Sequence, residues 1–257
     1  MQISPTCSVV LPVHNEAETI YPLLAEIVAV FDSVARQSYE IIIVDDGSND
    51  RSIAEIGRFK AAPPQPAPEK SFLTEIAVIV QPVRGGQAQA IMRGLRAARG
   101  ELIVTMDSDG QYDPADIPRL LAKVESCDMV CGMRTSRRDG IARLLVSRLA
   151  NGFRNLVTGD SLHDGGCTFR ILRRKCLAAI LPLDGRLNGC DFFFHPLFAG
   201  KAGFIVREEP VAHRPRAGGR TNYRLMRGRF GSGFIACFKA RKLVSASHRG
   251  GFVSDDQ

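Results

Sequence analysis

The chain has 257 residues, of which 45% are hydrophobic, and a formal net charge of +7 at pH 7. This is the size and composition of a globular protein with one full core. The seven cysteines form no CxxC pair and no Cys/His cluster, which argues against disulfides and a zinc site. The sequence has neither the build of a signal peptide nor a run of about 20 apolar residues, so we expect a cytoplasmic protein, placed free or at the cytoplasmic face of a membrane.

The first half of the chain repeats one pattern, in which a strand is followed by a polar loop and a helix. Apolar runs predict strands over 7–13, 40–44, 76–80 and 102–106, and the β-branched run over 40–44 is typical of a strand buried on both faces. Helical spacing of apolar residues follows over 16–30 and 87–98. The repeat predicts an α/β fold, with a mostly parallel sheet flanked by helices and a ligand crevice at the carboxyl ends of the strands.

Two of these strands end in paired carboxylates. Asp107 and Asp109 follow the strand over 102–106, and Asp45 and Asp46 follow the strand over 40–44. Residues two apart on a strand point the same way, so Asp107 and Asp109 repel each other unless a divalent cation lies between them. The alternative is a simple Asp-rich turn.

Two further strand ends carry polar loops. The first strand runs into His14, Asn15 and Glu16, where Glu16 either borders a ligand or caps the next helix. Arg84, Gly85 and Gly86 precede the helix over 87–98, and glycine N–H groups at a helix N-terminus attract phosphate. A plain turn is the alternative here.

The excess positive charge is concentrated late in the chain, within 134–148 and 207–242. Nucleic acid, anionic lipid and phosphorylated substrates are the ligand classes that such a charge attracts. No nucleic-acid-binding module is recognisable, so we expect no nucleic-acid partner.

Five segments together resemble family 2 glycosyltransferases with the GT-A fold, and most closely those that transfer sugars to polyprenyl or dolichyl phosphate. These segments are 10–16 (VLPVHNE), 44–48 (VDDGS), 106–111 (MDSDGQ), 164–170 (DGGCTFR) and 209–223 (EPVAHRPRAGGRTNY). The resemblance covers roughly 7–223, and it implies a single GT-A domain over 1–223.

The resemblance also implies the donor side of a reaction. The donor would be a UDP- or GDP-linked sugar, bound by Pro12, His14, Asn15, Glu16, Asp46, Arg84, Asp107 and Ser108. Asp46 would accept hydrogen bonds from the base or the ribose. The implied metal is Mg²⁺ or Mn²⁺, held by the catalytic residues Asp107 and Asp109 together with Gln111.

On the acceptor side, the resemblance implies a polyprenyl phosphate and an inverting single displacement. A phosphate is already an anion at pH 7, so it needs cations to hold it rather than a general base. The residues implied for this role are Arg134, Asp164, Arg170 and Arg216. Cys167 and Thr168 interrupt the family pattern around Asp164.

The chief departure from the family pattern is the segment over 187–196, whose nearest acidic residue is Asp191. Asp191 would be the catalytic base if the acceptor were a saccharide hydroxyl, and otherwise it caps an aromatic helix. The sequence also leaves open a sugar-phosphate nucleotidyltransferase and a non-catalytic nucleotide-sugar binder. The loop after the first strand lacks the glycine-rich build of the former.

Three segments lie outside the predicted core of the domain. The Pro-rich stretch over 60–71 predicts a flexible loop, and 248–257 predicts a disordered tail. Over 224–247, Phe230, Phe234 and Phe238 recur among basic residues. This amphipathic pattern predicts either an interfacial helix in peripheral contact with an anionic membrane or a helix packed onto the domain.

Overall fold

The structure is a computed structural model that describes residues 5–35, 37–62, 72–135, 141–216 and 229–247. The predicted tail over 248–257 and most of the predicted loop over 60–71 lie outside these residues. Residues 60 and 61, the first two of that predicted loop, belong to a helix instead. Among the described residues, no helix combines the length and apolar character needed to cross a membrane.

One seven-stranded sheet forms the centre of the molecule, in the order β3-β2-β1-β4-β6-β5-β7. Its strands are β1 (Cys7–Val13), β2 (Tyr39–Asp45), β3 (Leu73–Val80), β4 (Leu102–Thr105), β5 (Met129–Arg134), β6 (Arg170–Arg173) and β7 (Val206–Val211). Only β6 runs antiparallel to its two neighbours. The predicted mostly parallel α/β sheet is therefore confirmed.

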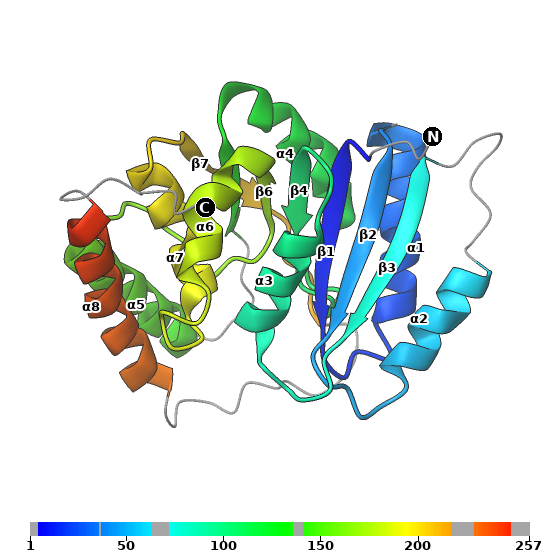
Figure 1. The fold of residues 1–257 in the computed structure, drawn as a ribbon, viewed down its shortest axis with the longest axis horizontal. Coiled ribbons are helices and arrows are strands. Elements are labelled where there is room, and N and C mark those ends of the chain that lie inside the picture. Colours follow the sequence, from blue (N-terminus) through cyan, green and yellow to red (C-terminus); the bar gives the residue numbers. More distant parts are fainter. Residues whose placement is uncertain (1–4, 36, 63–71, 136–140, 217–228, 248–257) are drawn as a thin grey trace, which may run out of the picture.

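Helices cover both faces of this sheet (Figure 1). They are α1 (Ile20–Val30), α2 (Ser52–Ala61), α3 (Gln87–Ala97), α4 (Ile117–Lys123), α5 (Ile141–Thr158), α6 (Leu177–Ile180), α7 (Asp191–Lys201) and α8 (Arg229–Ser247). A π-helical turn over Phe31–Ala35 extends α1. Short 3₁₀ turns occupy Pro114–Asp116, Val124–Ser126, Arg174–Cys176 and Leu181–Leu183.

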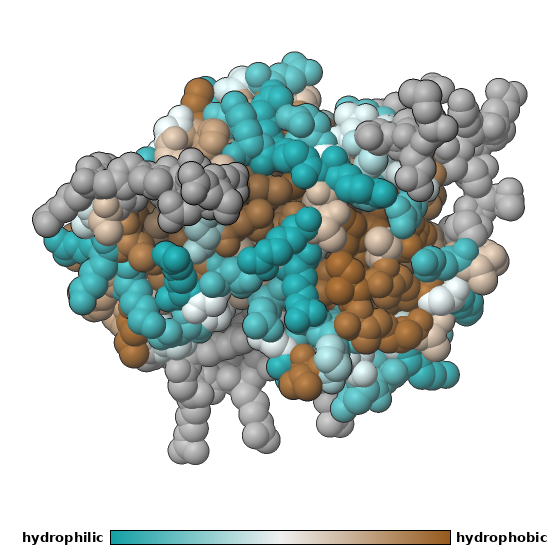
Figure 2. All heavy atoms as spheres, viewed as in Figure 1, coloured by the Kyte–Doolittle hydropathy of each residue, from teal (hydrophilic) through white to brown (hydrophobic). Residues whose placement is uncertain are grey.

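The alternation of side chains along β1 sorts the core into two layers. Val9, Leu11 and Val13 pack with α1, α2 and α4, whereas Val10 packs with α3, α6 and α7. Gly94 allows α3 to approach the sheet closely, because a Cβ there would lie 2.2 Å from Val10 Cγ1. Hydrophobic residues also gather on the surface over β2 and β3 beside α3 (Figure 2).

A third apolar cluster joins α8 to the domain. Ala236, Cys237, Ala240 and Val244 of α8 are buried in one cluster with residues of α7 such as Phe198. The described part of the predicted C-terminal segment is therefore a helix packed onto the domain. Phe230, which belongs to that pattern, lies where no side chain is described.

The register of the parallel strands places several loops at one edge of the sheet. Val13, at the end of β1, pairs with Asp45, at the end of β2, and β4, which runs parallel to β1, ends at Thr105 opposite Val10. The loops that begin at His14, Asp46 and Met106 therefore leave the same edge. This edge holds the predicted donor residues.

Candidate active site

Asp107 and Asp109 lie in the loop after β4 and interact strongly. Burial and the negative charge of Asp109 raise the pKa of Asp107 to about 7. The guanidinium of Arg134 acts in the opposite direction, and Gln87 Nε2 donates to Asp107 Oδ1 over 2.6 Å. Two hard oxygen donors with this mutual repulsion fit a divalent cation such as Mg²⁺ or Mn²⁺. No group of three or more His, Cys, Asp or Glu among the described residues is placed to hold a metal, so these two carboxylates would form only part of a coordination sphere.

Gln111, the predicted third ligand, lies just beyond this pair. Its backbone N–H donates to Asp109 Oδ1 over 3.1 Å, and its side-chain Nε2 donates to the Arg214 carbonyl over 3.4 Å. The side chain is thus turned toward the segment that follows β7.

Arg216 reaches the same carboxylates from that segment. Its guanidinium forms an ion pair with Glu16, and its Nη1 lies 3.8 Å from Asp109 Oδ2. Thr19 Oγ1 donates to Glu16 Oε2 over 3.1 Å and to the Ser108 carbonyl over 2.9 Å. The structure therefore joins Glu16, predicted on the donor side, with Arg216, predicted on the acceptor side.

Asp46 closes the glycine loop instead of facing solvent. The side chain is buried, and its Oδ1 accepts from Gly85 N over 2.6 Å and from Gln81 Nε2 over 3.1 Å. Oδ2 accepts from Gly86 N over 2.9 Å and lies 3.9 Å from Arg84 Nε. The predicted use of the Gly85 and Gly86 N–H groups for phosphate does not fit this arrangement. Both groups already donate hydrogen bonds to the Asp46 carboxylate.

The remaining donor-side residues connect the strand-end loops to one another. His14 Nδ1 bonds to the Asp46 carbonyl at 2.9 Å, and Ser108 Oγ donates to the Pro12 carbonyl over 2.7 Å. Asn15 has a positive φ of 58°, and its Oδ1 accepts from Asn49 N over 2.9 Å. These bonds hold the loops after β1, β2 and β4 together.

Arg134 and Asp164 form a two-pronged ion pair beside this site. Arg134 Nε lies 2.8 Å from Asp164 Oδ2, and Nη2 lies 2.8 Å from Oδ1. Arg170 of β6 pairs with Thr105 of β4 on one side and with Cys131 of β5 on the other, so Arg134, at the end of β5, leaves the sheet at the same edge as Asp107. The structure thus brings two predicted acceptor residues together at the same edge.

Two predicted site residues lie in the core instead. Arg170 is 1% exposed and donates to the carbonyls of Phe192 and Gly165. The guanidinium of Arg170 is bonded within the core, which does not agree with the predicted phosphate contact. Asp191 is 2% exposed at the start of α7, and its Oδ1 accepts from Leu187 N over 2.9 Å. This bond leads back to the segment before α7, and the N-cap of α7 is Cys190 without a side-chain cap bond, so Asp191 does not make the predicted cap.

Several contributors to the site were not predicted as site residues. They are Gln87, which binds Asp107, Thr168, which lies near Asp107, and Arg154 and Glu208, which hold the loop around Asp164. Three of them stood in or beside a recognised segment: Gln87 follows the glycine loop, Thr168 lies within 164–170, and Glu208 precedes 209–223.

His195 gives this region a pH-dependent stability. Burial, and then the charge of Arg170, hold the pKa of His195 well below its ordinary value of 6.5. Below pH 6.5 the imidazole of His195 therefore binds a proton in the unfolded chain but stays neutral in the folded protein. The free energy of unfolding falls as the pH drops. The loss from this group amounts to about 2 kcal/mol between pH 6.5 and pH 5. We expect the free energy of unfolding of His195→Gln, measured by urea denaturation at both pH values, to fall less than that of the wild type. An equal fall in the variant and the wild type would contradict this role of His195.

Comparison with known proteins identifies the family. The model of glycosyl transferase family 2 matches residues 8–181. The undecaprenyl-phosphate 4-deoxy-4-formamido-L-arabinose transferase of Edwardsiella ictaluri is 37% identical over 221 residues, covering 86% of this chain and 63% of that protein. The protein of the same name from Pseudomonas paraeruginosa is also 37% identical over 221 residues, and the match covers 86% of this chain and 61% of that protein. This chain therefore spans a little under two thirds of the length of these relatives.

Solved structures of GT-A glycosyltransferases share the fold. Glucosyl-3-phosphoglycerate synthase from Mycobacterium tuberculosis, solved with phosphoglyceric acid, has a TM-score of 0.58 at 21% identity, covering 92% of this chain and 80% of that one. The mannosyltransferase PcManGT from Pyrobaculum calidifontis, solved with GDP-Man and Mn²⁺, has a TM-score of 0.58 at 15% identity, covering 97% and 76%. With the family match over residues 8–181, this chain belongs to glycosyl transferase family 2 and has the GT-A fold.

Proposed function

We propose that this chain transfers a sugar from a UDP- or GDP-linked donor to a polyprenyl phosphate. The observation that carries the proposal is a pair of carboxylates flanked by two guanidinium groups. Arg134 ends β5 at the sheet edge where Asp107 follows β4, and Arg216 Nη1 lies 3.8 Å from Asp109 Oδ2. The names of the 37% identical relatives support the choice of a polyprenyl phosphate acceptor.

Asp107 and Asp109 are the residues that would hold a divalent ion in this reaction. Both supply hard oxygen ligands, and a cation between them would relieve the repulsion that raises the pKa of Asp107. Gln111 remains a proposed further ligand. A bound Mg²⁺ or Mn²⁺ ion supplies neutralisation of the departing diphosphate.

Arg134 and Arg216 would hold the acceptor phosphate. A phosphate oxygen attacks the anomeric carbon, the new C–O bond forms, and the bond to the nucleoside diphosphate breaks with inversion. No proton has to leave the nucleophile, so this route needs no general base. A saccharide hydroxyl as acceptor would need one, and Asp191 is buried and bonded to Leu187 N.

A transfer assay tests the proposal directly. The protein is incubated with UDP- and GDP-linked sugars, a polyprenyl phosphate and either Mn²⁺ or Mg²⁺, and the glycolipid is measured. We expect product with one nucleotide class, with metal present, and only with the phosphorylated lipid. Nucleotide-sugar binding without turnover would favour a non-catalytic binder, and turnover on a free saccharide would favour the hydroxyl acceptor.

We further propose peripheral contact with an anionic membrane, at the cytoplasmic face expected from the sequence. Helices α5 and α8 lie side by side (Figure 1), and Leu149, Leu156, Phe234 and Phe238 expose between 44% and 84% of their surface there. Exposed basic residues accompany them on α8, at Lys239 and Arg241. Such a surface suits the interface of an anionic bilayer.

Vesicle co-sedimentation tests this contact. We expect the protein to bind vesicles of anionic phosphatidylglycerol more strongly than vesicles of neutral phosphatidylcholine. Leu156→Ser should weaken that binding, whereas Ile53→Ser on α2, which is also exposed, should not. Equal binding by both variants would remove the α5–α8 surface from the proposal.

A further inference from the structure

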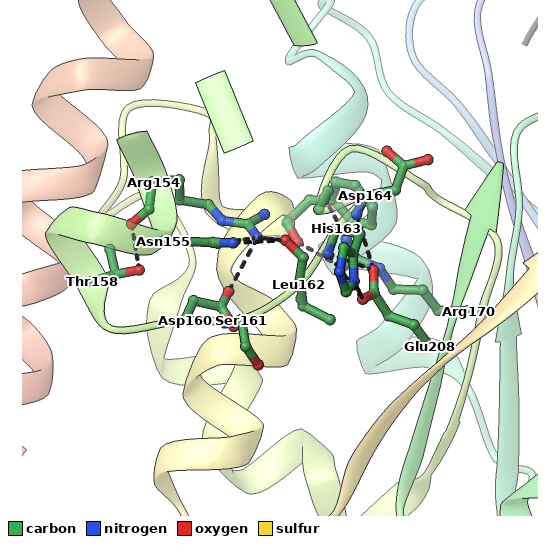
Figure 3. Close-up of polar contacts among 12 residues, drawn as sticks. Arg154, Asn155, Thr158, Asp160, Ser161, Leu162, His163, Asp164, Arg170 and Glu208 are labelled. Carbon is green, nitrogen blue, oxygen red and sulfur yellow. Dashed lines mark hydrogen bonds and ion pairs between the residues drawn. The ribbon is translucent and has the colours of Figure 1, made fainter. Parts of the chain in front are cut away.

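The loop over 160–167, between α5 and β6, is held by two buried arginines. Arg154, on α5, is 5% exposed, and its Nη2 donates to the Leu162 carbonyl over 3.1 Å and lies 3.3 Å from Asp160 Oδ2. Arg170, at the start of β6, donates to the Gly165 carbonyl over 2.8 Å. Figure 3 shows Arg154 reaching from α5 to Leu162, with Arg170 on the other side of the loop. The loop is thus tied both to the helix and to the sheet.

The guanidinium of Arg154 also occupies the space beside Gly165. A Cβ atom at Gly165 would lie 1.3 Å from Arg154 Nη1 and 2.5 Å from Cζ. Any side chain at position 165 must therefore displace either the loop or the guanidinium. This close approach, rather than an unusual backbone conformation, is what requires glycine here.

Glu208, on β7, holds the middle of the same loop. Its carboxylate accepts from His163 N over 2.9 Å, from Asp164 N over 2.9 Å, and bonds to His163 Nδ1 at 2.8 Å. Asp164 therefore lies between the positions held by Arg154, Arg170 and Glu208 (Figure 3). Its own carboxylate remains turned toward Arg134, with both oxygens bonded.

Stability alone is a poor reason for the burial of Arg170 at this loop. Within the described part of the chain, Arg170 donates to two carbonyls, stacks on the Phe192 ring at 3.8 Å and forms no ion pair with a carboxylate. Burying a guanidinium without a carboxylate partner costs free energy that apolar packing of similar volume would avoid. The planar guanidinium group does, however, hold the two carbonyls that it binds in one fixed geometry.

We propose that Arg154 is a positioning residue for the acceptor phosphate. Packed against Gly165, it fixes the 160–167 loop so that Asp164 orients Arg134 toward the carboxylate pair. The inference rests on the proposed function, because Arg134 is assigned there to the acceptor phosphate. Arg154 itself touches no substrate, and its effect passes through Gly165, Asp164 and Arg134.

The test is a double-mutant cycle on Arg154 and Gly165. We expect Gly165→Ala and Arg154→Ala each to lower kcat/KM for the polyprenyl phosphate by about tenfold to a hundredfold, the scale of a misplaced binding group. The dissociation constant of the nucleotide sugar should stay close to that of the wild type, and both variants should remain folded with a lower Tm, because each disturbs the buried pair of Arg154 and Asp160. In the Arg154→Ala background, Gly165→Ala should have little further effect, because the obstructing guanidinium is gone. Gly57→Ala is the matched control, since a Cβ at position 57 meets nothing within 4 Å.

A second readout does not depend on turnover. The Nε–H resonance of Arg134, assigned by its loss in Arg134→Lys, reports the bond to Asp164 in the ligand-free protein. We expect Gly165→Ala to shift this resonance and Gly57→Ala to leave it in place. Unchanged acceptor kinetics and an unchanged resonance in Gly165→Ala would overturn the positioning role, as would additive effects in the cycle. Absence of transfer by the wild type would instead overturn the proposed function. The Arg134 resonance would still test whether Arg154 and Gly165 position Asp164.

Discussion

Asp109→Asn is expected to abolish the metal-dependent binding of nucleotide sugars and to lower turnover by at least about a hundredfold. The variant loses one of the two carboxylates proposed to bind the divalent cation, and that cation would neutralise the departing diphosphate. The amide has nearly the shape of the carboxylate but lacks its negative charge. Thermal shift with Mn²⁺ and each nucleotide sugar measures the binding, since a ligand of the folded state raises its apparent stability.

Loss of binding in this variant can be separated from unfolding. Asp109 contributes to the raised pKa of Asp107, so removing its charge relieves repulsion in the ligand-free protein. The Tm without ligand should therefore be equal to or higher than that of the wild type. Asp184→Asn, at a residue paired with Arg96, is the control and should keep the shift. If Asp109→Asn kept the full metal-dependent thermal shift, the carboxylate pair would be part of an Asp-rich turn and not a metal site.

Arg216→Met is expected to raise the KM for the polyprenyl phosphate, by about tenfold to a hundredfold, with little change in donor binding. The guanidinium lies beside Asp109 and Glu16, and a charge-assisted hydrogen bond to a phosphate contributes about 1.5–3 kcal/mol. Steady-state kinetics with the lipid varied at saturating donor give the KM.

Arg214→Met provides a matched control two residues away. Arg214 pairs with Glu26 and Asp113 rather than with the carboxylates of the site. Its replacement should leave acceptor kinetics near those of the wild type, and Arg216→Lys should recover part of the loss. Unaltered acceptor kinetics in Arg216→Met would remove Arg216 from the phosphate site.

Local patterns in the sequence predicted the sheet and the edge that carries the site. Runs such as 40–44 have the composition of a strand buried on both faces, and the following carboxylates mark where the strand ends. Parallel strands bring their carboxyl ends together, so Asp46 and Asp107 belong to the same edge as soon as their strands are recognised. Side-chain alternation likewise predicted the repulsion between Asp107 and Asp109.

Tertiary structure alone decided which groups each charged side chain meets. Glu16 and Arg216 are 200 positions apart and form an ion pair, while Asp46 bonds to a loop 39 positions away. Periodicity reports only which face a residue occupies within its own element, so it cannot show these partners. The same limit explains Arg170, whose place at the start of β6 resembles a site position although the packing of the domain buries it.

By itself, then, the sequence determined the α/β sheet, the acidic strand ends and the family, because each depends on short segments and their order. The structure decided that Asp46 closes the glycine loop, that Asp191 bonds to the segment before α7, and that α8 buries one face and exposes another. These outcomes depend on burial and on contacts between distant segments. Both are properties of the packed chain, and no window of sequence contains them.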